Sequence, residues 1–168
     1  WANGINDFIY HAGSYLVFNA GTGYNISSGQ KFWPGSTGAP DNVVINSGNS
    51  ANLNDEGKTI NNLILWGGFT NNQSITINGN LEIHTGGYVA TNSPVYNSGS
   101  TLIYESNNIY GIGTEWENTP ANYPFNVLIT NNTTLNYRNI VKSRTINGNL
   151  TIDPGSSLYM DYNDNSSS

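Results

Sequence analysis

The decapeptide SITINGNLEI, residues 74–83, recurs almost unchanged as SRTINGNLTI, residues 143–152. In the first copy the alternate positions are aliphatic, namely Ile75, Ile77, Leu81 and Ile83. A period of two is typical of a strand that buries one of its faces. The alternation runs through the Asn-Gly dipeptide at the centre of each copy, so both halves of a copy present their aliphatic side chains on the same face.

Asn-Gly between two alternating runs is also a hairpin signal. A two-residue loop at Asn78-Gly79 sets Ile77 opposite Asn80 and Ile75 opposite Glu82. Each cross-strand pair then joins an apolar to a polar side chain, and neither face can be buried. A three-residue loop restores the match but places glycine in the middle, where such loops usually have it last. We therefore favour a bend within a continuing strand path, with glycine where the backbone is most crowded.

Further strand-like runs lie between turn-forming clusters, at 42–48, 59–65, 100–106, 125–131 and 156–162. The decapeptide recurs with an offset of 69 residues, whereas NVVI at 42–45 recurs as NVLI at 126–129 with an offset of 84. The difference of 15 residues is about the length of 56–70, which has no counterpart in the second unit. Loss of one such segment is natural in a stack of coils in which each coil touches only its neighbours.

The sequence therefore predicts an all-β fold, a β-solenoid of the right-handed parallel β-helix type, with little or no helix. Val, Ile and Leu are expected inside, and inward-facing Asn side chains at the corners are expected to form ladders. Segment 1–40 is aromatic-rich and less regular, which predicts an N-terminal cap. Residues 41–160 are expected to form the repeats, and 161–168 a polar tail or linker.

Composition narrows the classes of function. The chain has 168 residues, 30 of them Asn, and a formal charge of −6 with five Lys and Arg. Such a chain lacks the basic face that nucleic acid requires, and no run is apolar enough for membrane insertion. The absence of cysteine excludes disulfides and thiolate metal sites. High Asn, Ser and Thr with low Lys suit a bacterial exported protein.

Several segments resemble large secreted and cell-surface proteins of Bacteroidota, especially flavobacteria. These segments are KFWPGSTGAPDNVVINSG (31–48), KTINNLIL (58–65), SITINGNLEIHTGG (74–87), GTEWENTPANYPFNVLITNNTTL (113–135) and RTINGNLTIDPGSSL (144–158). The resemblance implies β-helical repeats, adhesin-like roles and export by the type IX secretion system, with the secretion machinery as a partner. It supplies no catalytic motif that matches residue by residue.

Six residues in the middle of the chain are candidates for ligand binding, namely Tyr104, Tyr110, Glu115, Trp116, Glu117 and Tyr123. The glutamates of GTEWEN form the one close glutamate pair, and paired carboxylates can hydrolyse glycosides. We nevertheless expect this pair to form an exposed corner beside Trp116. The aromatic residues form a glycan or protein platform if they face outward, and otherwise pack at corners and under loops.

Other chemistry has weaker signals. Lys142 and Arg144, with Arg138 nearby, offer the base of a lyase, although we expect all three on the surface. His84 follows a strand at a position that continues its polar face, so we expect its side chain to be solvated.

Asp161, Asn163 and Asn165 match the first three ligand positions of a calcium loop, but the expected glycine is Ser166. Calcium is the one cofactor that the sequence suggests, and the alternative is a polar tail.

The leading hypothesis is a non-enzymatic structural or adhesive β-solenoid module of a larger exported bacterial surface protein. No convergent catalytic set is visible in the sequence, so we expect no enzyme. Surface glycans or other proteins are the expected partners. One alternative is a carbohydrate-binding or carbohydrate-active β-helix, acting as a glycoside hydrolase or polysaccharide lyase. Another is a cargo fragment of a secretion system.

Overall fold

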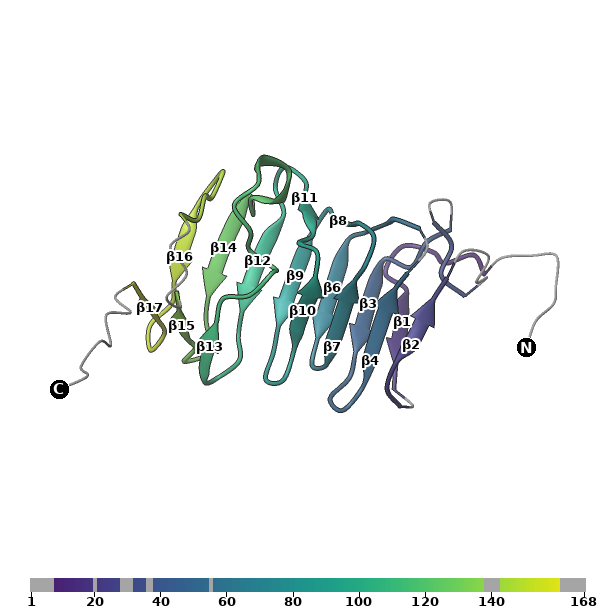
Figure 1. The fold of residues 1–168 in the computed structure, drawn as a ribbon, viewed down its shortest axis with the longest axis horizontal. Coiled ribbons are helices and arrows are strands. Elements are labelled where there is room, and N and C mark those ends of the chain that lie inside the picture. Colours follow the sequence, from purple (N-terminus) through teal and green to yellow (C-terminus); the bar gives the residue numbers. More distant parts are fainter. Residues whose placement is uncertain are drawn as a thin grey trace.

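The chain folds as a parallel β-solenoid whose strands stack along one long axis (Figure 1). The computed structural model describes residues 8–19, 21–27, 32–35, 38–54, 56–137 and 143–160. Within these ranges the only helix is the 3-10 turn η1 (Pro120–Asn122). The prediction of an all-β solenoid with almost no helix is therefore confirmed.

Four parallel sheets make up the walls of the solenoid. The first sheet contains, in spatial order, β1 (Tyr15–Phe18), β3 (Asn42–Ile45), β6 (Asn62–Leu65), β9 (Asn80–Ile83), β12 (Thr101–Tyr104), β14 (Asn126–Ile129) and β16 (Leu150–Ile152). The second contains β10 (Tyr88–Thr91), β7 (Gly68–Asn71), β4 (Ser50–Leu53) and β2 (Tyr24–Ile26). The third contains β11 (Val95–Tyr96), β8 (Ile75–Ile77) and β5 (Lys58–Ile60), and the fourth contains β13 (Ile109–Gly111), β15 (Thr134–Asn136) and β17 (Ser157–Tyr159).

In the central part of the molecule a coil consists of three strands, one from each of the first three sheets. The chain passes from β6 through β7 and β8 and returns to the first sheet as β9, directly beside β6. All strand pairs of the described chain are parallel, and the first sheet advances by one strand per coil. The antiparallel hairpin is thereby excluded for both decapeptides.

The register of the first sheet stacks its inward side chains in two columns. One column consists of Leu16, Val43, Leu63, Leu81, Leu102, Val127 and Leu150. The other consists of Phe18, Ile45, Leu65, Ile83, Tyr104, Ile129 and Ile152. From β3 to β14 every member of both columns is buried. Burial of each such side chain contributes about 1.5–3 kcal/mol, so these columns are the main stabilising element of the fold.

The Asn-Gly dipeptide is the corner where the chain passes from the third sheet to the first. The Gly79 amide donates to the Asn61 carbonyl at 2.9 Å, and the Asn80 amide donates to Asn62 Oδ1 at 2.9 Å. A Cβ atom at Gly79 would lie 2.6 Å from that Oδ1 atom. Glycine is therefore required because the bend lies directly against the preceding coil. The predicted bend is confirmed, with the same face buried on both sides of it.

The second decapeptide repeats this corner on a different coil. Gly148 donates to the Phe125 carbonyl at 2.5 Å, and the Asn149 amide donates to Asn126 Oδ1 at 3.1 Å. Here a Cβ atom on the glycine would lie 2.7 Å from the Asn126 Oδ1 atom. The two copies are thus similar in sequence because each must fit its bend against an asparagine of the coil before it.

The unequal offsets of the two repeats reflect one additional coil. Between Asn42 and Asn80 the first sheet contains the intervening strand β6, whereas β14 and β16 are direct neighbours. The first unit therefore passes through two coils where the second passes through one. The segment that lacks a counterpart belongs to this additional coil, as the spacing predicts.

Asparagine ladders are present, but most of them lie on exposed corners instead of facing inward. Asn46 donates to Asn19 at 2.9 Å, and Asn97 donates to Asn78 at 2.6 Å, both at the surface. A buried amide must satisfy all its hydrogen bonds without water, whereas an exposed one can use solvent for the remainder. The expectation of inward ladders is therefore wrong for most of these pairs.

Aromatic side chains gather near the first coil, as expected. The ring centre of Phe18 lies 5.2 Å from the ring centre of Tyr24, 6.3 Å from that of Phe32 and 6.1 Å from that of Trp33. However, β1 and β2 already pair with β3 and β4, so regular coils begin before residue 41. In the described part of the chain, no helix has the length and apolar character needed to cross a bilayer.

The contribution of the interior columns can be measured with two leucines that occupy the same column. Leu81 is fully buried, whereas Leu150 is 42% exposed. We expect Leu81→Ala to lower the free energy of unfolding by about 2–5 kcal/mol, because it removes buried contacts and leaves a cavity. Leu150→Ala should cost clearly less in the same urea titration. Equal losses for both variants would contradict the assignment of the columns as the core.

Candidate functional site

The structure separates the six candidate ligand-binding residues. Tyr104, Glu115 and Trp116 are buried, so these three cannot contribute to an outward platform. The Trp116 indole donates to the Thr145 carbonyl at 3.0 Å and packs with the core. The expectation of an exposed corner at Glu115 is therefore wrong.

The remaining candidates are only partly exposed. Tyr110 packs against the core, with its ring centre 5.4 Å from that of Tyr104. Glu117 and Tyr123 are half-buried, and Glu117 lines a groove that is described below. The two glutamates of GTEWEN thus lie in different environments, one in the interior and one in the groove. Their role as a catalytic pair receives no support from this arrangement.

Glu115 is the centre of a polar cluster inside the solenoid. Its Oε1 atom accepts hydrogen bonds from the Tyr104 hydroxyl at 2.9 Å and the Gly113 amide at 2.8 Å. Its main-chain carbonyl accepts a third from the Tyr96 hydroxyl at 2.7 Å. Burial raises the pKa of the carboxyl group, although the hydrogen bonds from the Gly113 amide and the Tyr104 hydroxyl and the charge of Arg144 oppose the rise. The cluster fixes the 113–117 turn to the strands of the preceding coil.

Two basic residues, Lys58 and Arg144, have buried side-chain nitrogen atoms. Lys58 is in register with the buried Ile75, and its Nζ atom donates to the Trp33 carbonyl at 2.8 Å and pairs with Glu56. Arg144 aligns with the same Ile75 through the decapeptide repeat. Its Nε and Nη1 atoms are buried and make no hydrogen bond with the described residues. The expectation that Arg144 decorates the surface is therefore wrong.

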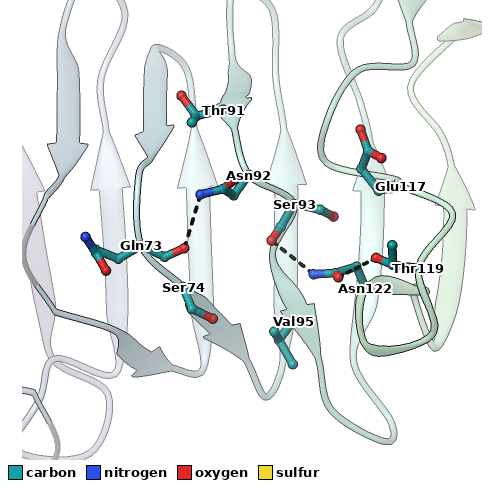
Figure 2. A pocket seen from close by; sticks show the side chains of 9 residues that line it. All are labelled: Gln73, Ser74, Thr91, Asn92, Ser93, Val95, Glu117, Thr119 and Asn122. Carbon is teal, nitrogen blue, oxygen red and sulfur yellow. Dashed lines mark hydrogen bonds between the residues drawn. The ribbon is translucent and has the colours of Figure 1, made fainter.

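A polar groove of about 440 Å³ lies where connections from three successive coils meet (Figure 2). Its walls are the β7–β8 connection, the end of β10 with the residues that follow it, and the loop that contains η1. The lining consists of Gln73, Ser74, Thr91, Asn92, Ser93, Val95, Glu117, Thr119 and Asn122. Eight of these nine side chains are polar, so the groove offers amide, hydroxyl and carboxylate groups to a ligand.

Hydrogen bonds between coils shape the groove. Asn122 donates to the Ser93 carbonyl at 3.1 Å and the Pro94 carbonyl at 2.7 Å, which attaches the η1 loop to the coil before it. Asn92 donates to the Gln73 carbonyl at 3.5 Å (Figure 2). Thr91, at the rim, has a φ of 77°, a strained value for a β-branched residue. Strain of this kind concentrates at functional sites and supports a role for the groove.

A second cluster of chemically active side chains lies on the outer face of the first sheet. Glu82 is on β9, His84 follows it, and Glu105 follows β12. The His84 Nε2 atom lies 3.6 Å from Glu82 Oε2 and 3.1 Å from Glu105 Oε1. The imidazole also stacks on the Trp66 indole, with ring centres 3.8 Å apart. His84 is only 9% exposed, so the expectation of a solvated histidine is wrong.

Sequence reasoning missed this cluster. Glu82 and His84 are two residues apart in a strand-like run, which places both on one face. That signal was available, but it identifies only two of the three groups. Glu105 joins them because Ile83 and Tyr104 are in register, and this register depends on the length of the coil between them.

The calcium candidates Asp161, Asn163 and Asn165 lie outside the described residues, as do Arg138 and Lys142. No protein-family model matches the chain, and comparisons with curated proteins and with solved structures likewise gave no match.

The buried carboxyl group should make stability depend on pH. The pKa of Glu115 is raised above its ordinary value of 4.5, so the folded chain binds this proton more tightly than the unfolded chain does. The stability that this protonation adds is fully present below the pKa that Glu115 has in the unfolded chain. It is lost as the pH rises through the pKa that Glu115 has in the folded chain.

The uncharged Glu115→Gln variant should therefore lose less stability than the wild type between pH 4.5 and pH 7. Urea midpoints at the two pH values measure the difference, and Glu105, whose pKa is also raised, contributes equally to both proteins. Circular dichroism at the lower pH checks that the variant is folded. The same pH dependence in both proteins would show that Glu115 is not proton-linked to folding.

Proposed function

We propose that the chain is a non-enzymatic structural and adhesive β-solenoid module. The observation that carries this proposal is the uninterrupted pair of interior columns, which tie successive coils into one elongated body (Figure 1). In such a body each coil contacts only its neighbours, so binding surface grows with length. A protein of this form suits a spacer that presents contact surface along its sides.

The cellular setting of this module is a further part of the proposal. The resemblance to flavobacterial surface proteins, together with the Asn-rich and weakly charged composition, favours a secreted or cell-surface location in a bacterium. Export by the type IX secretion system as part of a larger protein accords with that resemblance. The solenoid fold is consistent with this origin.

Carbohydrate binding is the most specific role that the groove supports. Sugar hydroxyl groups donate and accept hydrogen bonds, and side-chain amides and hydroxyls do the same. Gln73, Asn92 and Thr119 supply such groups around a volume of about 440 Å³, and Glu117 adds a charged acceptor. We assign the adhesive contact of the module to this groove, with surface glycans as the ligands.

Glycan binding is expected to depend on the groove and not on asparagines elsewhere. On an array of bacterial and host glycans, Glu117→Gln and Asn92→Ala should each weaken binding about tenfold or more, as expected for loss of a hydrogen bond to a charged or desolvated group. Asn97→Ala is the matched control, because Asn97 is exposed on a ladder outside the groove. It should leave the binding unchanged.

Two results would overturn the proposal in different ways. If no glycan binds, or if all three variants lose binding equally, the groove is not the adhesive surface. If the wild type releases reducing sugars and Glu117→Gln or Glu115→Gln abolishes the release, the chain is a carbohydrate-active enzyme. Both measurements use the full 168-residue chain.

A further inference from the structure

The Glu82, His84 and Glu105 cluster has a geometry that goes beyond a surface ion pair. One oxygen from each glutamate and one imidazole nitrogen lie within 4.8 Å of one another. In tetrahedral zinc sites the bonds to nitrogen and oxygen are about 2.0–2.2 Å, so the ligand atoms are roughly 3.3–3.6 Å apart. The separations of 3.6 Å and 3.1 Å from His84 Nε2 lie close to that range. A metal ion fits among the three groups with small side-chain adjustments.

The three groups are held by the sheet and not by mobile loops. The His84 amide donates to the Leu65 carbonyl at 2.9 Å, and the Glu105 amide donates to the Ile83 carbonyl at 2.9 Å. Both residues thus continue the hydrogen-bond ladder of the first sheet just beyond its strands. Ligands that are carried by a rigid element keep their relative positions, as metal binding requires.

Neighbouring side chains orient the donors. Trp66 lies nearly parallel to the imidazole, with an angle of 11° between the two rings. Asn80 Nδ2 lies 3.5 Å from Glu82 Oε1 and donates to it, which leaves Oε2 facing the histidine. Contacts that fix a ligand's orientation in this way are characteristic of metal sites.

The electrostatics favour a cation between the two carboxylates. The side chains of His84, Glu82 and Glu105 are 11%, 22% and 25% exposed, so water screens them only in part. One oxygen atom of Glu82 lies within 4.8 Å of one of Glu105, so the two carboxylates repel each other, and a bound cation would relieve this repulsion.

We propose that Glu82, His84 and Glu105 form a three-ligand site for a divalent transition-metal ion of the zinc type. A neutral imidazole with two carboxylates is a donor set for such ions, whereas calcium and magnesium prefer sites built only from oxygen. Three protein ligands leave at least one coordination position for water or an external ligand. The site lies outside the polar groove and does not depend on the adhesive function proposed above.

The competing explanation is a protonated His84 that pairs with both carboxylates and binds no metal. Calorimetry with Zn²⁺ on the tag-free full chain distinguishes the two. We expect one equivalent to bind, and His84→Gln and Glu105→Gln each to weaken binding by about tenfold or more. His11→Gln is the matched control, because His11 is exposed, and it should bind as the wild type does. Calcium should not compete at equal concentration.

Trp66 provides a second readout that locates the ion. Co²⁺ quenches indole fluorescence at short range, and Trp66 stacks on the proposed ligand. Addition of Co²⁺ should quench the wild type, and Trp66→Phe, which keeps an aromatic ring on the imidazole, should abolish the metal-dependent quenching and lower zinc affinity far less than His84→Gln does. Circular dichroism checks that each variant is folded, and Glu82→Gln replaces any ligand variant that is not.

Three results would each refute the site. They are the absence of zinc binding to the wild type, an unchanged affinity in folded His84→Gln and Glu105→Gln, and cobalt quenching that persists in Trp66→Phe. The ion-pair explanation predicts the first of these.

Discussion

Register in the first sheet is the constraint on which the rest of the molecule depends. Each coil must return its chain to this sheet with the same parity, because a shift of one residue would turn every aliphatic side chain outward. The coils satisfy this condition with very different lengths, from 18 residues between Leu63 and Leu81 to 27 between Tyr15 and Asn42. The differences in coil length are accommodated in the other three sheets and at the corners. The groove lies in that part of the molecule, where the η1 loop takes the place of a strand of the third sheet.

Polar and charged groups occur inside this solenoid chiefly near corners. Tyr104 takes a place that aliphatic residues occupy in neighbouring coils, and its hydroxyl meets Glu115 from a turn. Lys58 similarly reaches the Trp33 carbonyl, which a preceding loop provides. Loops have carbonyl and amide groups that no ladder uses, so they can satisfy a buried polar side chain that a strand could not. The irregular connections therefore determine where polar and charged side chains can be buried in an otherwise aliphatic core.

The fold could be predicted from the sequence because its signals are local. Alternation around Gly79 and the offsets of the repeats follow from nearest-neighbour rules, and both predictions are confirmed. The candidate sites depend on contacts between coils that no local pattern encodes. The sequence predicts an exposed polar corner at Glu115 and Trp116. The turn instead directs both side chains inward, where Glu115 accepts a hydrogen bond from the Tyr104 hydroxyl and Trp116 donates one to the Thr145 carbonyl. Glu105 lies beside His84 only because the length of the coil between them places Tyr104 in register with Ile83.

The additional coil in the first unit has a consequence for how such a protein changes its size. Asn61 and Gly79 hold equivalent places on successive coils, since Asn62 and Asn80 begin neighbouring strands of the same sheet. Excision of residues 62–79 would rejoin the backbone at matching points and leave both flanking ladders ready to pair. Duplication at the same boundary would lengthen the rod without disturbing its ends. The length of this solenoid can therefore change by whole coils, in evolution or by design. Each corner asparagine marks a position where a coil can be removed or inserted.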